Sequence, residues 1–69
     1  MKYEIKYDSI YREKEWVTLT KEIEANSDAE AIKMAQKFVR ELNKNKGIER
    51  FELRRLIRID QEKRATIVL

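Results

Sequence analysis

Two carboxylates near the C-terminus, Asp60 and Glu62, lie close enough in the sequence to act together on a metal ion or a proton. They fall in a predicted turn, where both residue types commonly serve turn geometry and solubility. A carboxylate metal site needs several converging oxygens, and no third acid is placed to join them. Ser9 and Ser27 could be nucleophiles, but the chain has no histidine to activate them and no cysteine. The sequence therefore predicts a protein that is not an enzyme, without catalytic residues, metal ligands or cofactors.

Arginine is the other residue type with recognisable chemistry here, and four arginines crowd the segment 50–58. They could bind phosphates or a partner's acidic surface, or they could form cross-strand ion pairs on a hydrated sheet face. On the sheet face predicted to be open, basic and acidic side chains are nearly equal in number, which favours ion pairing. The expected basic set is Lys2, Lys6, Arg50, Arg54, Arg58 and Arg64, and the expected acidic set is Glu4, Asp8, Glu22, Glu52 and Asp60.

Apolar residues on the same predicted face suggest protein binding. Alternation along the strands turns Trp16, Leu56 and Val68 away from the core. Arg54 and Arg58 would rim this cluster, and tryptophan and arginine are enriched at binding hot spots. Alternatively, Trp16 only covers the end of a hairpin beside Tyr11, since isolated exposed apolar residues are common. We predict a protein interface formed by Trp16, Arg54, Leu56, Arg58 and Val68.

A basic ridge on the predicted helix supports a second function. Lys33, Lys37, Arg40 and Lys44 are spaced by four, three and four residues, so they share one face of a helix. Residues 33–69 carry a net charge of +6, whereas residues 1–32 carry −3. Such a ridge could follow a nucleic-acid backbone, or it could be a lysine-rich solvent face built from good helix formers. Nucleic-acid binding through this ridge is therefore the alternative to protein binding.

The elements that position these residues follow from local patterns. Alternating apolar residues predict strands at 2–8 and 16–24, joined by a hairpin loop of four or five residues. Ser27 and Glu30 form a capping box at the start of a helix predicted over residues 28–44. Gly47, the only glycine, is predicted to end that helix in a left-handed conformation.

Two further strands are predicted at 51–60 and 64–69. A bulge at Arg54 and Arg55 would turn Leu56 inward but would send Ile57 and Ile59 to water. We therefore expect a regular strand, in which Leu56 faces outward and only Arg55 lays its stem on the core. The order is ββαββ, an α+β fold with one helix on one face of a four-stranded, mainly antiparallel sheet. It forms a single domain over residues 1–69.

The last predicted strand differs from the earlier three because "ATIVL", residues 65–69, is apolar on both faces. Ala65, Ile67 and Leu69 are expected to meet the helix, which leaves Thr66 and Val68 for another chain. A strand of this kind at a sheet edge can pair with a strand of a partner. The sequence thus predicts partner binding or homodimerisation through the C-terminal strand.

The passage "IEANSDAEAIKMAQKF", residues 23–38, resembles a strand-to-helix motif of small proteins encoded by bacteriophages and other mobile elements. The matching residues are Ala25, Ser27, Glu30, Ala31, Ile32 and Ala35. The ββαββ order and the size are also similar to those of some phage inhibitors of bacterial defence, anti-CRISPR proteins among them. The resemblance implies an inhibitor or adaptor that binds a host protein, and it carries no catalytic residue across.

No signal peptide is visible at the N-terminus, and the longest apolar stretch is too short to span a bilayer. With the absence of cysteine, these features favour a cytoplasmic location and no membrane contact. The expected partner is a protein, and the alternatives are a nucleic acid and a structural homodimer.

Overall fold

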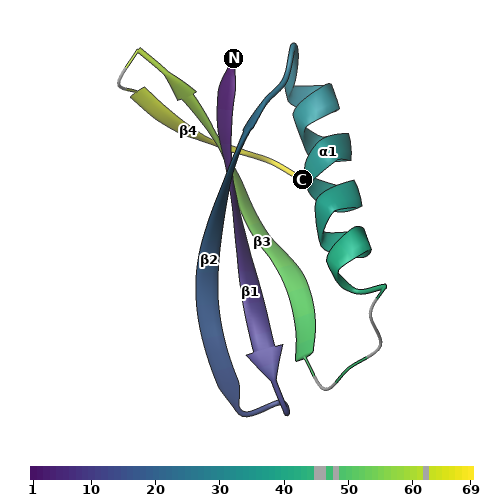
Figure 1. Cartoon of the computed structure of the whole chain (residues 1–69). Coiled ribbons are helices and arrows are strands. Elements are labelled where there is room, and N and C mark those ends of the chain that lie inside the picture. The colour runs from purple at the N-terminus through teal and green to yellow at the C-terminus, as the bar shows by residue number, and fades with distance from the viewer. Residues whose placement is uncertain (45–46, 48, 62) are drawn as a thin grey trace.

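The chain folds into a twisted sheet with a helix along one side (Figure 1). The computed structural model describes residues 1–44, 47, 49–61 and 63–69, and within them the protein has four strands and one helix. These are β1 (Lys2–Tyr11), β2 (Glu15–Glu24), α1 (Asp28–Leu42), β3 (Glu49–Asp60) and β4 (Lys63–Ile67). The strand order is β2-β1-β3-β4, and every pairing is antiparallel. The predicted α+β fold in the order ββαββ is confirmed.

The hairpin between β1 and β2 is tighter than predicted. Tyr11 pairs with Glu15, so residues 12–14 form the loop and the predicted four- or five-residue loop is wrong. The Lys14 N–H donates to the Tyr11 carbonyl at 3.0 Å, while Arg12 and Glu13 have φ values of 53° and 58°. These left-handed conformations cost energy in residues that have a Cβ. The Arg12 guanidinium lies 5.4 Å from the centre of the Tyr11 ring, and this contact offsets part of that cost.

The start of α1 is fixed by a cap and by a tether to the sheet. The Ser27 Oγ accepts a hydrogen bond from the Glu30 N–H at 3.2 Å, which confirms this half of the predicted capping box. The Asp28 carboxylate accepts from the Tyr3 hydroxyl at 2.6 Å and from the Arg58 guanidinium at 2.9 Å and 3.2 Å. The hydrogen bond from Tyr3, and then that from Arg58, lowers the pKa of Asp28. The same bond to Asp28 raises the pKa of Tyr3.

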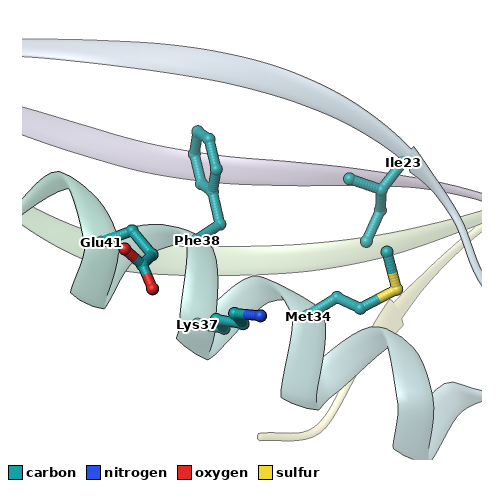
Figure 2. A pocket seen from close by; sticks show the side chains of 5 residues that line it. All are labelled: Ile23, Met34, Lys37, Phe38 and Glu41. Atoms are coloured by element: carbon teal, nitrogen blue, oxygen red, sulfur yellow. The ribbon is translucent and has the colours of Figure 1, made fainter.

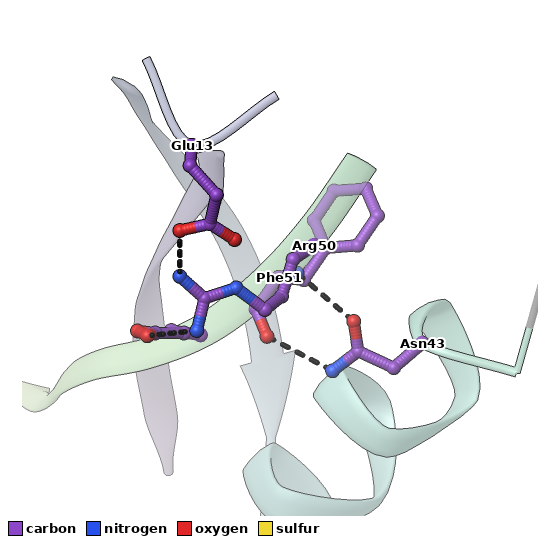
Figure 3. A network of polar contacts seen from close by, with 5 residues as sticks. Glu13, Asn43, Arg50 and Phe51 are labelled. Atoms are coloured by element: carbon purple, nitrogen blue, oxygen red, sulfur yellow. Dashed lines mark hydrogen bonds and ion pairs between the residues drawn. The ribbon is translucent and has the colours of Figure 1, made fainter. Parts of the chain in front are cut away.

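The end of α1 is held by Asn43, which docks it onto β3 (Figure 3). The Asn43 side chain donates to the Phe51 carbonyl and accepts from the Phe51 N–H, both at 2.9 Å. The Asn43 backbone stays right-handed, with φ −80°, and its N–H donates to the Val39 carbonyl at 3.1 Å. The helix therefore ends at Leu42, two residues before the predicted end. The predicted left-handed cap at Gly47 is wrong, and Gly47 has no positive φ.

β3 contains a bulge at its arginine pair, so the predicted regular strand is wrong. Lys6 of β1 lies opposite Arg55, but Tyr7 lies opposite Leu53, which makes Arg54 the extra residue. The shift turns Leu56 to the helix side, where it is fully buried. It also turns Arg55 to the open face, where it is exposed. The predictions of an outward Leu56 and an inward Arg55 are corrected accordingly.

The bulge also changes which apolar residue of β3 lies on the open face. The bulge does turn Ile57 to the open face, yet Ile57 is buried. Glu4 and Arg64 form an ion pair, although their strands, β1 and β4, lie on opposite sides of β3. Glu4 lies opposite Ile57 and Arg64 lies opposite Ile59, so the pair crosses β3 diagonally between these two residues. Long paired side chains thus shield an apolar residue where there is no helix.

The main core lies between α1 and the facing sides of β1 and β3. Ala31 and Ala35 are fully buried on the inner face of α1, where their small side chains allow the helix to approach the sheet. The Phe38 ring lies edge-on to the Tyr7 ring, with 5.1 Å between the ring centres. A helix is about 10 Å wide and strands are about 4.8 Å apart, so one helix covers about two strands. Because α1 lies over β1 and β3, β2 is left at the margin.

Candidate protein-binding surface

β2 is the most exposed of the described strands. Every residue in it is exposed except Ile23, which is half-buried. Val17 and Leu19 are on the helix side, yet they remain 55% and 37% exposed. In the adjacent strand, Tyr3 and Ile5 are fully buried on that same side. The lateral position of α1 therefore leaves an apolar strip on β2 uncovered.

β2 is also an edge strand, with β1 on one side and no described strand on the other. It is ten residues long, whereas β4, at the opposite edge, has five residues. In an antiparallel edge strand, alternate residues direct their N–H and C=O groups outward, where another strand can pair with them. In Figure 1, α1 lies toward the β3 side of the sheet, away from this edge. β2 thus offers backbone hydrogen bonding beside exposed apolar side chains.

A groove of about 330 Å³ continues the apolar strip between β2 and α1 (Figure 2). Its apolar wall is formed by Ile23 of β2 and by Met34 and Phe38 of α1. Lys37 and Glu41 also line it from the helix. In Figure 2, Ile23 and Met34 approach each other from opposite walls, while the Phe38 ring extends from α1 toward the sheet. The groove can receive apolar side chains, and Lys37 and Glu41 offer charges of both signs beside them.

A second hollow, of about 280 Å³, lies on the open face at the bulge and is lined by Lys6, Thr18, Arg54 and Arg55. Its charges are partly matched by the buried carboxylate of Asp8. Asp8 accepts a hydrogen bond from Thr18 at 2.7 Å and forms an ion pair with Arg54 at 3.2 Å. The Lys6 ammonium donates to Thr20 at 2.7 Å. These contacts favour the ion-pairing interpretation of the arginines over phosphate binding.

Trp16 of β2 lies directly opposite Ile10, a fully buried residue on the open face. On its other side, Ile10 has Arg50 of β3 as its cross-strand neighbour. Arg50 pairs with Glu13 at 2.9 Å, and Figure 3 shows this contact reaching from β3 to the hairpin loop. Trp16 stays 58% exposed. Tyr11 pairs with Glu15 and therefore faces the other side of the sheet, so the predicted position of Trp16 beside Tyr11 is wrong.

The structure does not bring the five predicted interface residues together. Leu56 is in the core, and Arg58 pairs with Asp28 at 2.9 Å on the helix side. Trp16 and Arg54 are on the open face, while Val68 follows the end of β4 and is 91% exposed. The prediction of one apolar cluster of Trp16, Leu56 and Val68 is wrong, because the bulge removes its central member. The sequence did not identify Val17 and Leu19 as exposed apolar residues, although one helix is too narrow to cover four strands.

Of the predicted nucleic-acid ridge, Lys33, Lys37 and Arg40 are exposed on α1, while Lys44 is exposed beyond the end of the helix at Leu42. Lys44 forms an ion pair with Glu41 at 3.2 Å, and Lys37 lines the apolar groove. Binding of a nucleic acid by this ridge stays a prediction.

Comparison with known proteins identifies no relative. No family model, no curated protein and no solved structure matches the chain. The resemblance to phage-encoded inhibitors therefore stays a prediction. Among the described residues, no helix is long and apolar enough to cross a membrane, and no group of three or more acidic side chains is placed to hold a metal ion.

Proposed function

We propose that this chain is a protein–protein interaction domain that binds an extended segment of its partner along β2. The partner segment adds as a further strand to the sheet, and its side chains on the helix side contact Val17 and Leu19. A longer apolar side chain enters the groove at Ile23, Met34 and Phe38. Binding a partner through an added strand requires no catalytic residue, and this mode of binding suits an inhibitor or an adaptor.

The observation that carries this proposal is the exposed edge of β2, with apolar residues on the side where the neighbouring strands are buried. Main-chain hydrogen bonds supply affinity in strand addition, and pockets for alternate side chains supply specificity. β2 and the groove provide both. On the open face, by contrast, several basic side chains already have acidic or hydroxyl partners. These partners disfavour binding of a polyanion on the open face.

The proposal is tested with extended peptides selected from a random display library on the immobilised protein, with affinities measured by fluorescence anisotropy. We expect selected peptides to alternate apolar and polar residues and to bind Leu19→Lys about tenfold or more weakly, because a charge replaces an apolar contact. Their affinity should change little at raised salt, in contrast to phosphate binding.

Val68→Lys is the matched control, because it places the same charge on an exposed apolar residue at the other edge of the sheet. It should leave the affinity of the selected peptides unchanged. Loss of binding with Val68→Lys alone would assign the surface to the C-terminal strand. Binding that resists both substitutions would refute the proposed function.

A further inference from the structure

We infer that the partner at β2 is a second copy of this chain, paired antiparallel about a two-fold axis at Thr18. This inference rests on the proposed function. The two sheets join into one continuous sheet, with both helices on the same face. The inference depends on symmetry, on charge and on the exposure of β2.

Symmetry leaves few ways for β2 to pair with itself. A two-fold axis perpendicular to the sheet keeps the helix sides of both copies together. Residues directly opposite each other in an antiparallel pair point to the same face, so helix-side residues must meet helix-side residues. The helix-side residues of β2 are Glu15, Val17, Leu19, Lys21 and Ile23. Some residue of β2 must therefore lie opposite its own copy at the axis. If two successive residues lay opposite each other instead, a helix-side residue would meet an open-face residue.

Charge selects Thr18 as that residue. With the axis at Thr18, each Glu15 lies opposite the partner's Lys21, and each Val17 lies opposite the partner's Leu19. An axis at Leu19 would place Val17 opposite Lys21, and an axis at Thr20 would place Leu19 opposite Lys21. An axis at Lys21 would oppose two like charges. Only the axis at Thr18 matches both the charged and the apolar residues.

The open face is compatible with the same register. Thr18 meets Thr18 at the axis, and Trp16 meets the partner's Thr20. Beyond the strand, Lys14 of the hairpin loop lies level with the partner's Glu22, which adds another pair of opposite charges. In an antiparallel ladder, two residues directly across from each other stabilise the pairing when they have opposite charges or are both apolar, and they destabilise it when they have like charges.

This register explains two features of β2. Val17 and Leu19 of both copies meet in one four-residue apolar cluster, so the strip that α1 leaves open is buried by the partner. Lys21 points to the helix side of an edge strand, where a charge normally prevents pairing with other strands. Its match with Glu15 permits the register centred on Thr18 and penalises the others. β4, the other edge, contains Lys63 and Arg64 and no acidic residue within Lys63–Ile67, so it offers no such match.

Sedimentation equilibrium with exchanged charges tests the register. Glu15→Lys and Lys21→Glu should each raise the dimer dissociation constant about tenfold or more, because two attractive pairs per dimer become repulsive. The double variant Glu15→Lys/Lys21→Glu should return to within about threefold of the parent. An equimolar mixture of the two single variants should also associate, since each repulsive pair becomes attractive in the mixed dimer. Failure of both restorations would overturn the register.

Two controls show whether the charge acts at β2 and whether each variant is folded. Lys33→Glu changes the same charge on α1, outside β2, and should leave the dissociation constant unchanged. Circular dichroism of each variant confirms that its fold is retained. A parent chain that sediments as a monomer at millimolar concentration, yet binds the selected peptides through Leu19, would overturn the second copy as the partner and leave the proposed function standing. A monomer that binds no peptide would overturn both.

Discussion

Replacing Leu56 with alanine should destabilise the protein strongly, because the bulge in β3 places Leu56 in the core. Leu56 is fully buried between its cross-strand neighbours Ile5 and Ile67. The lost transfer free energy is about 2 to 3 kcal/mol, and with the cavity left behind the total reaches about 2 to 5 kcal/mol. A chain of this length is stabilised by only about 3 to 10 kcal/mol. Urea unfolding followed by circular dichroism should therefore show a large loss, and the melting temperature should fall by about 10 °C or more.

Val68→Ala is the control for this experiment. Val68 is 91% exposed, so its truncation should change the free energy of unfolding by less than about 0.5 kcal/mol. A regular β3 would place both Leu56 and Val68 on the open face and would make both substitutions mild. A bulged β3 makes them differ by about 2 kcal/mol or more. Equal, small effects would show that the arginine pair does not shift the strand and that the core is assigned wrongly.

Three further predictions concern the start of α1 and its outer face. Ser27→Ala should lower the free energy of unfolding by about 0.5 to 2 kcal/mol in urea titrations, because the Glu30 N–H loses its partner. Because folding lowers the pKa of Asp28, this residue stabilises the fold above its usual pKa of 3.8, and that stability is lost as pH falls through the lowered pKa. Because folding raises the pKa of Tyr3, this residue stabilises the fold below its usual pKa of 10.0, and that stability is lost as pH rises through the raised pKa. Asp28→Asn should therefore flatten the acid side of a plot of unfolding free energy against pH, and an unchanged acid side would contradict the tether. Reversing Lys33, Lys37, Arg40 and Lys44 to Glu should abolish any binding of a labelled oligonucleotide while the fold is retained; tight binding by the parent at physiological salt would favour the nucleic-acid alternative.

The features that the sequence predicted are those decided by near neighbours along the chain. Alternation in β1 places Tyr3 and Ile5 in the core without reference to any other strand. The Ser27 cap needs only the amide three residues later. Order and type of the elements follow from such local signals, and so the ββαββ fold could be predicted.

The features that the sequence did not predict depend on contacts between distant residues. Asn43 ends α1 because Phe51 accepts and donates at 2.9 Å, and this contact outweighs the usual preference for glycine. The bulge places Leu56 between Ile5 and Ile67 of the two flanking strands, and on the other face Glu4 and Arg64, 60 residues apart, form an ion pair across β3. The exposure of Val17 depends on where α1 lies across the sheet. None of these contacts leaves a pattern in a short window of sequence.

The arginines of β3 mainly form ion pairs that lie over apolar residues or hold α1 in place. The apolar residues on the helix side of β2 remain exposed. Arg50 reaches Glu13 near Ile10, Arg54 reaches the buried Asp8, and Arg58 holds the start of α1 through Asp28. Exposed ion pairs contribute little free energy by themselves, about 0 to 1 kcal/mol each, but long side chains held in place exclude water from the apolar residues beneath them. Ile57 is consequently buried on the face without a helix, whereas Val17 is exposed on the face with one. Val17 and Leu19 thus lie exposed along an edge strand, and for this reason we place the proposed binding surface on β2 and not on the arginine-rich face.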